Sequence, residues 1–201
     1  MPASPAPTVT AAPSAPAAPA ASAASAVGAS PTPPAAPARA LPAADSAGPA
    51  VGFDPDEIRL DEPTRSARLK WVVVVDESLD PGRAANAVAC VTAATVTGVH
   101  GLLGPGAPDA DGGTHTGLPW TGCTVLGAPR ATLAALRAKA VAAPGVHVAD
   151  MPAIAQQIRV YTEYLAAMAG RPADAHDYLA LSIVGPRNRV DRLVGKLRLL
   201  G

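Results

Sequence analysis

The chain has 201 residues, with 16 basic and 16 acidic side chains, so its formal net charge is zero. This balance argues against broad nucleic-acid binding, because proteins that hold a nucleic acid neutralise several phosphates with a basic patch. One basic cluster stands near the end of the chain, and we interpret it as the solvated face of the last helix: Arg187, Arg189, Arg192, Lys196 and Arg198.

Residues 1–52 are nearly all Ala, Pro, Ser, Gly and Thr and carry almost no charge. Without large apolar side chains, such a segment cannot bury enough surface to offset the entropy of ordering its backbone, and its frequent prolines block a helix. We therefore predict a disordered Ala/Pro-rich arm over residues 1–52. A charged linker over residues 53–68 and one folded domain over residues 69–201 are expected to follow.

The sequence predicts neither a signal peptide nor a membrane span. No Lys or Arg precedes Arg39, and no stretch approaches eighteen consecutive apolar residues. A cytoplasmic location is expected. Cys90 and Cys123 fit that compartment, and we interpret both as reduced thiols that serve as small core residues.

The predicted core opens at Lys70 and continues with an apolar, mainly β-branched run over residues 71–75, which is typical of a strand buried on both faces. Asp80 then offers a side-chain cap, and Pro81 suits the first helical position. A helix of small residues is predicted over residues 84–97, followed by a long loop.

The rest of the chain alternates strands and helices. The predicted order is a strand over 121–126, a helix over 131–142, a strand over 146–149, a long helix from its N-cap Asp150 to Met168, a strand over 179–184 and a helix over 188–194. This order predicts an α/β fold, a three-layer α/β/α sandwich around a four-stranded mixed sheet.

Three passages resemble a known family: the strand at 70–76, the turn and helix at 79–94, and the closing segment at 183–200. In this order they resemble the archaeal and eukaryotic type of peptidyl-tRNA hydrolase, which implies a peptidyl-tRNA hydrolase II-like fold. The chain is more similar still to an uncharacterised bacterial family of that superfamily, domain of unknown function 2000 (DUF2000). The shared motifs are Pro81-Gly82-x-Ala84-Ala85-Asn86-Ala87 and Asp109-Ala110-Asp111-Gly112.

The resemblance also implies which residues of the hydrolases are missing. Those enzymes carry a Lys, a Gln and a His on the first helix. When Cys90 is set against the family's cysteine, Ala85, Ala89 and Thr92 take these three positions. Alanine can neither activate a water nor stabilise an oxyanion, so the resemblance implies a domain without the hydrolase Lys/His/Gln set.

The remaining hydrolase positions match only in part. Ile154 and Ala180 stand where the family has threonines, and Asp150 alone keeps its residue type. The expected N-cap position of Asp150 already accounts for a carboxylate there.

A polar and aromatic stripe follows Asp150, because Gln157, Tyr161 and Tyr164 are spaced i, i+4 and i+7. Such a stripe would suit a small polar ligand at the carboxyl edge of the sheet, where α/β proteins open their clefts. Ordinary amphipathicity with tyrosines at its boundary is the alternative. Asn86, in the first turn of the first helix, would face the same cleft.

We therefore expect a domain that binds a small molecule or a protein partner in a cleft formed by Asn86, Asp150, Gln157 and Tyr161. The alternative is a hydrolase of altered chemistry on an ester or amide substrate, in which Asp150 acts with Thr92 or Asn86. Residual transfer-RNA binding through the basic cluster is a third hypothesis. A homodimer is also expected, because domains with short sheets often cover an edge in this way.

No metal or cofactor site is predicted. Asp109, Asp111 and His115 lack the spacing and the downstream Glu of a calcium loop. The other histidines have no zinc-type spacing, and the chain has neither a nucleophile elbow nor a phosphate-binding Gly-Lys-Ser/Thr loop.

Overall fold

The structure is a computed structural model of the chain, and it describes residues 50–201. Residues 1–49, which include almost all of the predicted arm, lie outside the described residues. Within the described part, no helix is both long and apolar enough to span a membrane.

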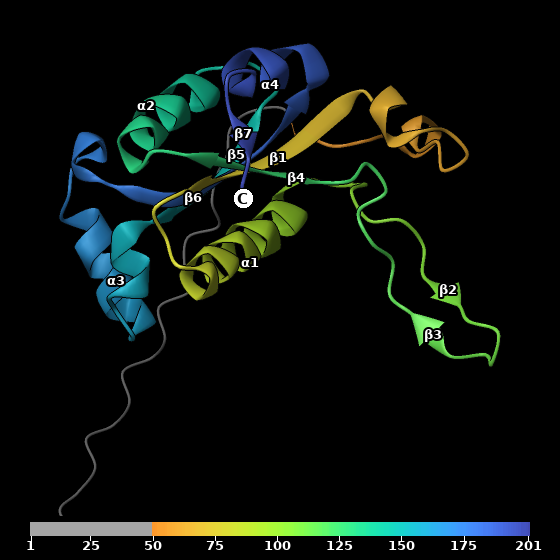
Figure 1. Cartoon of the computed structure of the whole chain (residues 1–201), viewed down its shortest axis with the longest axis horizontal. Helices are drawn as coiled ribbons and strands as arrows, with labels where there is room; N and C mark the ends of the chain where they lie inside the picture. The colour runs from red at the N-terminus through yellow and green to blue at the C-terminus, as the bar shows by residue number, and fades with distance from the viewer. Residues whose placement is uncertain (1–49) are drawn as a thin grey trace, which may run out of the picture. The chain divides into compact units, whose positions relative to one another are not determined.

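A five-stranded mixed sheet forms the centre of the domain, in the order β5-β6-β1-β4-β7 (Figure 1). The central strand β1 (Leu69–Asp76) runs parallel to β4 (Thr124–Ala128) and antiparallel to β6 (Tyr178–Pro186). The outer strands, β5 (His147–Pro152) and β7 (Arg198–Leu199), are both antiparallel to their neighbours. The four valines of β1 have no exposed surface, so the prediction of a strand buried on both faces is confirmed.

The expected number of strands, four, was wrong because β7 was missed. Only Arg198 and Leu199 form this strand, by pairing with Gly127 and Leu126 of β4. Two residues, one of them charged, show no strand pattern of their own. Only the neighbouring strand makes them extended.

Helices cover the two faces of the sheet unequally. Figure 1 shows α1 (Pro81–Gly98) below the sheet, and α2 (Arg130–Val141) and α4 (Arg187–Val194) above it.

The predicted start of α1 is confirmed, since the Asp80 side chain accepts a hydrogen bond from the Arg83 amide and Pro81 opens the helix.

The long helix predicted from Asp150 does not form. Asp150 lies within β5, opposite Leu181 of β6, and the chain then passes through the short 3-10 helix η3 (Ala153–Gln156) into α3 (Tyr161–Ala169). Pairing with β6 supplies the backbone hydrogen bonds here, and it buries Met151 on the α1 side of the sheet. This long-range pairing outweighs the local capping signal.

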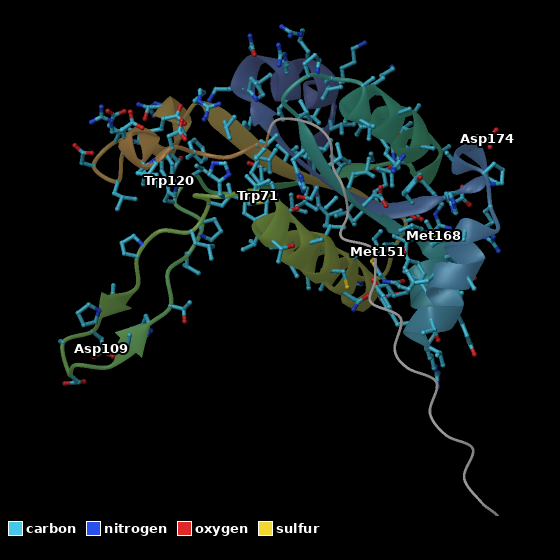
Figure 2. The ribbon with its side chains drawn as sticks, turned by 180° about the vertical axis from the view of Figure 1, so that it is seen from behind. Trp71, Asp109, Trp120, Met151, Met168 and Asp174 are labelled. Atoms are coloured by element: carbon cyan, nitrogen blue, oxygen red, sulfur yellow. The ribbon has the colours of Figure 1, made fainter. Side chains whose placement is uncertain are left out.

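Part of the predicted loop forms a hairpin that projects from the domain. Its strands are β2 (Ala107–Pro108) and β3 (Thr114–His115), and Asp109 lies at its tip (Figure 2). The Asp109 carboxylate accepts hydrogen bonds from the amides of Asp111 (2.9 Å) and Gly113 (2.8 Å) and lies 3.1 Å from His115 Nε2. The acidic motif is therefore used in closing a turn.

The charged segment before β1 contains two single-turn 3-10 helices, η1 (Pro55–Glu57) and η2 (Thr64–Ser66). Phe53, at the start of this segment, is only 1% exposed, and its ring centroid lies 4.8 Å from that of Trp120. The segment therefore packs against the domain and contributes to its core.

Buried polar groups join α1 to the sheet. The indole Nε1 of Trp71 donates to the Ser182 hydroxyl (2.8 Å), which lies 2.6 Å from the Thr95 hydroxyl. Thr95 in turn donates to the Val91 carbonyl (2.7 Å). Ser182 and Thr95 have no exposed surface, so these bonds satisfy polar groups that water cannot reach.

Candidate functional site

An open pocket of about 730 Å³ lies on the α1 face of the sheet, between α1, β4 and β7. We call it the α1–β7 pocket. Most of its lining is apolar and includes Leu79, Ala85, Val88, Ala89, Leu199 and Leu200. The polar side chains in the lining are those of Glu77, Thr92 and Arg198.

The pocket exists because α1 covers only part of the sheet. This helix packs over β5, β6 and β1, and its buried side chains Ala84, Ala87 and Val91 are small. On β4, Gly127 offers no side chain: a Cβ built there would lie 3.4 Å from atoms of both Glu77 and Leu200. Small residues on both sides thus leave the β4–β7 half of this face open.

The three helix positions that the resemblance assigns to the hydrolase Lys, Gln and His all lie in this pocket. Ala85, Ala89 and Thr92 line it together, as their i, i+4, i+7 spacing on α1 requires. Thr92 is the one polar side chain among them. Where a hydrolase would place charged and amide groups, this chain has mainly methyl groups.

Two charged side chains, Glu77 and Arg198, line the pocket near Gly127. Glu77 follows the end of β1, and Arg198 pairs with Gly127 in the ladder between β4 and β7. Within residues 50–201, neither side chain takes part in an ion pair. Both are therefore available to the polar end of a ligand.

A smaller pocket of about 280 Å³ lies where β5 ends and η3 and α3 begin. We call it the Tyr161 pocket. Its lining brings together two predicted site residues, Asp150 and Tyr161, with Cys90, Arg159 and Tyr164. Thr92, the predicted catalytic partner of Asp150, lines the α1–β7 pocket instead.

The Asp150 carboxylate forms an ion pair with Arg137, which comes from α2. The Arg137 side chain also lies over the ring of Tyr178, with its Cζ 5.2 Å from the ring centroid. Asp150 therefore already has a charged partner in this structure. Its Oδ2 is therefore already engaged in a hydrogen bond to Arg137 Nε.

The other two predicted ligand residues line neither pocket. The Asn86 amide oxygen accepts a hydrogen bond from Gln156 Nε2 (3.1 Å), and Gln156 also bonds to Arg83. Gln157 is exposed, because η3 ends at Gln156 and the predicted helical spacing is interrupted. Asn86 therefore helps to attach η3 to α1.

Both cysteines are exposed, so their assignment to the core was wrong. On α1, Ala87 and Val91 face the sheet, whereas Cys90 turns toward the Tyr161 pocket. Because most residues of this helix are small, the sequence did not indicate which face of the helix is buried. The two thiols form no disulfide.

The carboxylate of Asp76, the last residue of β1, is fully buried, and it was not predicted as a site residue. It accepts hydrogen bonds from the Ser78 amide and hydroxyl (3.0 and 2.7 Å) and from Arg130 Nε (2.6 Å). Burial alone would raise the pKa of Asp76, but these hydrogen bonds and the charge of Arg130 hold it below its usual value. A lone Asp directly after a valine run was the available signal.

Among residues 50–201, no three His, Cys, Asp or Glu side chains come together in a way that could hold a metal ion. In particular, Asp109 and His115 lie together at the tip of the hairpin without a third ligand.

Residues 69–201 match a family model described as "Protein of unknown function (DUF2000)". The match covers more than half of the chain, so the protein belongs to the DUF2000 family, as its motifs predicted. No curated protein matches the chain.

A solved structure is similar to this one: the protein of unknown function Atu0240 from Agrobacterium tumefaciens strain C58. The two share 13% identity with a TM-score of 0.62, and the comparison covers 67% of this chain and 98% of the other. At this identity the similarity concerns the fold alone.

Proposed function

We propose that this DUF2000 domain binds a small, mostly apolar molecule in the α1–β7 pocket. The observation that carries the proposal is the pocket itself: its volume of about 730 Å³ lies within the range of ligand sites, roughly 300–1,000 Å³. An apolar lining with a few polar groups is also typical of such sites. Glu77, Thr92 and Arg198 would orient the ligand.

Binding is favoured over hydrolysis by the chemistry of the lining. Cleaving an ester or amide needs an activated water and a group that stabilises the oxyanion, and Ala85 and Ala89 supply neither. Asp150, the base that the hydrolase alternative pairs with Thr92, lies in the other pocket. A peptidyl-tRNA hydrolase II-like ancestry is part of this proposal, supported by the three helix positions that the resemblance assigns to the hydrolase residues, which share one pocket.

The test is an NMR screen of aliphatic and aromatic fragments against the full chain. Bound fragments should shift the amides of α1, β4 and β7. Ala89→Phe should fill the pocket and weaken binding at least about tenfold. Ala94→Phe is the matched control, because Ala94 is an exposed alanine of the same helix outside the pocket.

Fragments that bind Ala89→Phe as tightly as the natural chain would contradict the proposal. The hydrolase alternative is tested by turnover of a peptidyl-tRNA mimic, with an authentic hydrolase of this type and Asp150→Ala beside it. We expect no turnover above background. Turnover that Asp150→Ala abolishes would establish the altered-chemistry hydrolase instead.

A further inference from the structure

We propose that the Tyr161 pocket is a second, separate binding site, and that its ligand is a small aromatic carboxylate. Adjacent residues of α1 divide the two pockets: Ala89 lines the α1–β7 pocket, and Cys90 lines the Tyr161 pocket. Figure 2 shows Met151, another lining residue, between α1 and α3. The inference does not depend on what the α1–β7 pocket binds.

The pocket owes its lining to the interruption between two helices. Because η3 ends at Gln156 and α3 begins at Tyr161, residues 157–160 belong to neither helix. Two residues of this connection, Ile158 and Arg159, line the pocket beside Tyr161 and Tyr164. An apolar residue, a guanidinium and two phenol rings therefore meet at one opening.

The two tyrosines provide aromatic surface. Their ring centroids lie 5.5 Å apart with the planes inclined by 45°, and Tyr161 is 68% exposed. A ligand ring that stacks on Tyr161 would bury aromatic area that now faces water. Burial, and next the negative charge of Asp150, raise the pKa of Tyr164, so its hydroxyl stays protonated at neutral pH and can donate a hydrogen bond.

The free charge in the pocket is positive. Asp150 is paired with Arg137, whereas Arg159 forms no ion pair and no side-chain hydrogen bond within residues 50–201. A guanidinium presents parallel donors that match the two oxygens of a carboxylate. The volume of about 280 Å³ is slightly below the range of roughly 300–1,000 Å³ for sites of drug-sized ligands, so the pocket fits a ligand of one ring. Together these features select an aromatic ring that carries one carboxylate.

The test is a titration of the full ¹⁵N-labelled chain with sodium benzoate, with benzamide as the neutral ligand of the same shape. Benzoate should shift amides at residues 150–164 and at Cys90, and benzamide should bind at least about tenfold more weakly. Arg159→Gln should weaken benzoate binding by a similar factor. Arg171→Gln, an exposed arginine outside the pocket, is the matched control and should not change it.

Alkylation provides an independent readout, because Cys90 is exposed and lines the pocket. In a Cys123→Ser background it is the one remaining thiol of the chain. Benzoate should slow its alkylation by iodoacetamide, and Tyr161→Ala should abolish that protection without affecting the fold, since Tyr161 is largely exposed.

The inference would be overturned by the absence of any shift with millimolar benzoate, by equal benzoate affinity in Arg159→Gln, or by an unchanged alkylation rate of Cys90. Shifts that centre on Ala85 and Leu199 would also overturn it, because they would place benzoate in the α1–β7 pocket. That last outcome would leave the proposed function standing, so the two proposals fail separately.

Discussion

The two faces of the sheet differ in how completely they are covered. On the α2–α4 face, two helices contribute leucines and valines, such as Leu133 and Val190, which pack against Val72, Leu181 and Ile183. On the other face, within the described residues, α1 is the one long helix over the sheet; it contributes mainly alanines and leaves β4 and β7 open, and both pockets lie beside this helix. Two helices therefore close one face, whereas one alanine-rich helix leaves part of the other face open.

The largest expected effect is a loss of stability from a substitution on the α2–α4 face of the sheet. Leu133→Ala removes a side chain with no exposed surface and should lower the free energy of unfolding by about 3 kcal/mol, through lost burial and the cavity left behind. Urea unfolding measures it. Leu199→Ala, at a pocket residue 72% exposed, should cost less than about 0.5 kcal/mol. Equal losses in the two variants would contradict the contrast between the faces.

The next effect concerns the buried carboxylate at the end of β1. Asp76→Asn keeps the shape of the side chain but leaves Arg130 without its charged partner and turns an amide donor toward other donors. We expect a loss of about 2 kcal/mol in the free energy of unfolding, measured in urea at pH 7. A variant as stable as the natural chain would show that the ion pair with Arg130 does not stabilise the fold.

The same carboxylate predicts a dependence on pH. Because its pKa is lowered in the folded state, Asp76 stabilises the fold fully above its ordinary pKa of 3.8. That contribution is lost as the pH falls through the lowered pKa of the folded state. The stability difference between the natural chain and Asp76→Asn should therefore shrink on acidification below pH 3.8, as urea unfolding at several pH values would show. A constant difference would argue against the pKa shift.

The smallest effect tests the polar contact between α1 and the sheet. Ser182→Ala leaves the Trp71 indole without its acceptor in the core and should cost about 1.5 kcal/mol of unfolding free energy. Thr97→Ala is the control, because Thr97 is exposed and its hydroxyl bonds only to a carbonyl of its own helix. Should both variants unfold alike, the buried network would not hold α1 in place.

Sequence patterns predicted the elements that depend on neighbouring residues. The valine run became the central strand, and the Asp80-Pro81 pair became the start of α1. Prediction was wrong where distant segments decide the conformation. Asp150 is extended because β6 lies beside it, and Arg198 is extended because β4 does.

Pairing and packing between distant segments also separate the residues of the predicted binding site. Asp150 and Tyr161 share a pocket, whereas Thr92 lines the other one and Asn86 is bonded to Gln156. A broken helix between Gln156 and Tyr161 moved Gln157 away from the expected stripe. Whether these residues bind a ligand stays a prediction, as do the homodimer and the cytoplasmic location.

The sequence by itself determined the α/β class, the central strand, the first helix and the family, because these follow from local periodicity, capping and short motifs. Only the tertiary structure decided where the pockets lie. The α1–β7 pocket joins Ala85 and Leu199, and the Tyr161 pocket joins Cys90 and Arg159, in each case from segments far apart in the chain. Which distant segments line a pocket depends on strand pairing and on the size of the packed side chains. No local sequence pattern contains that information.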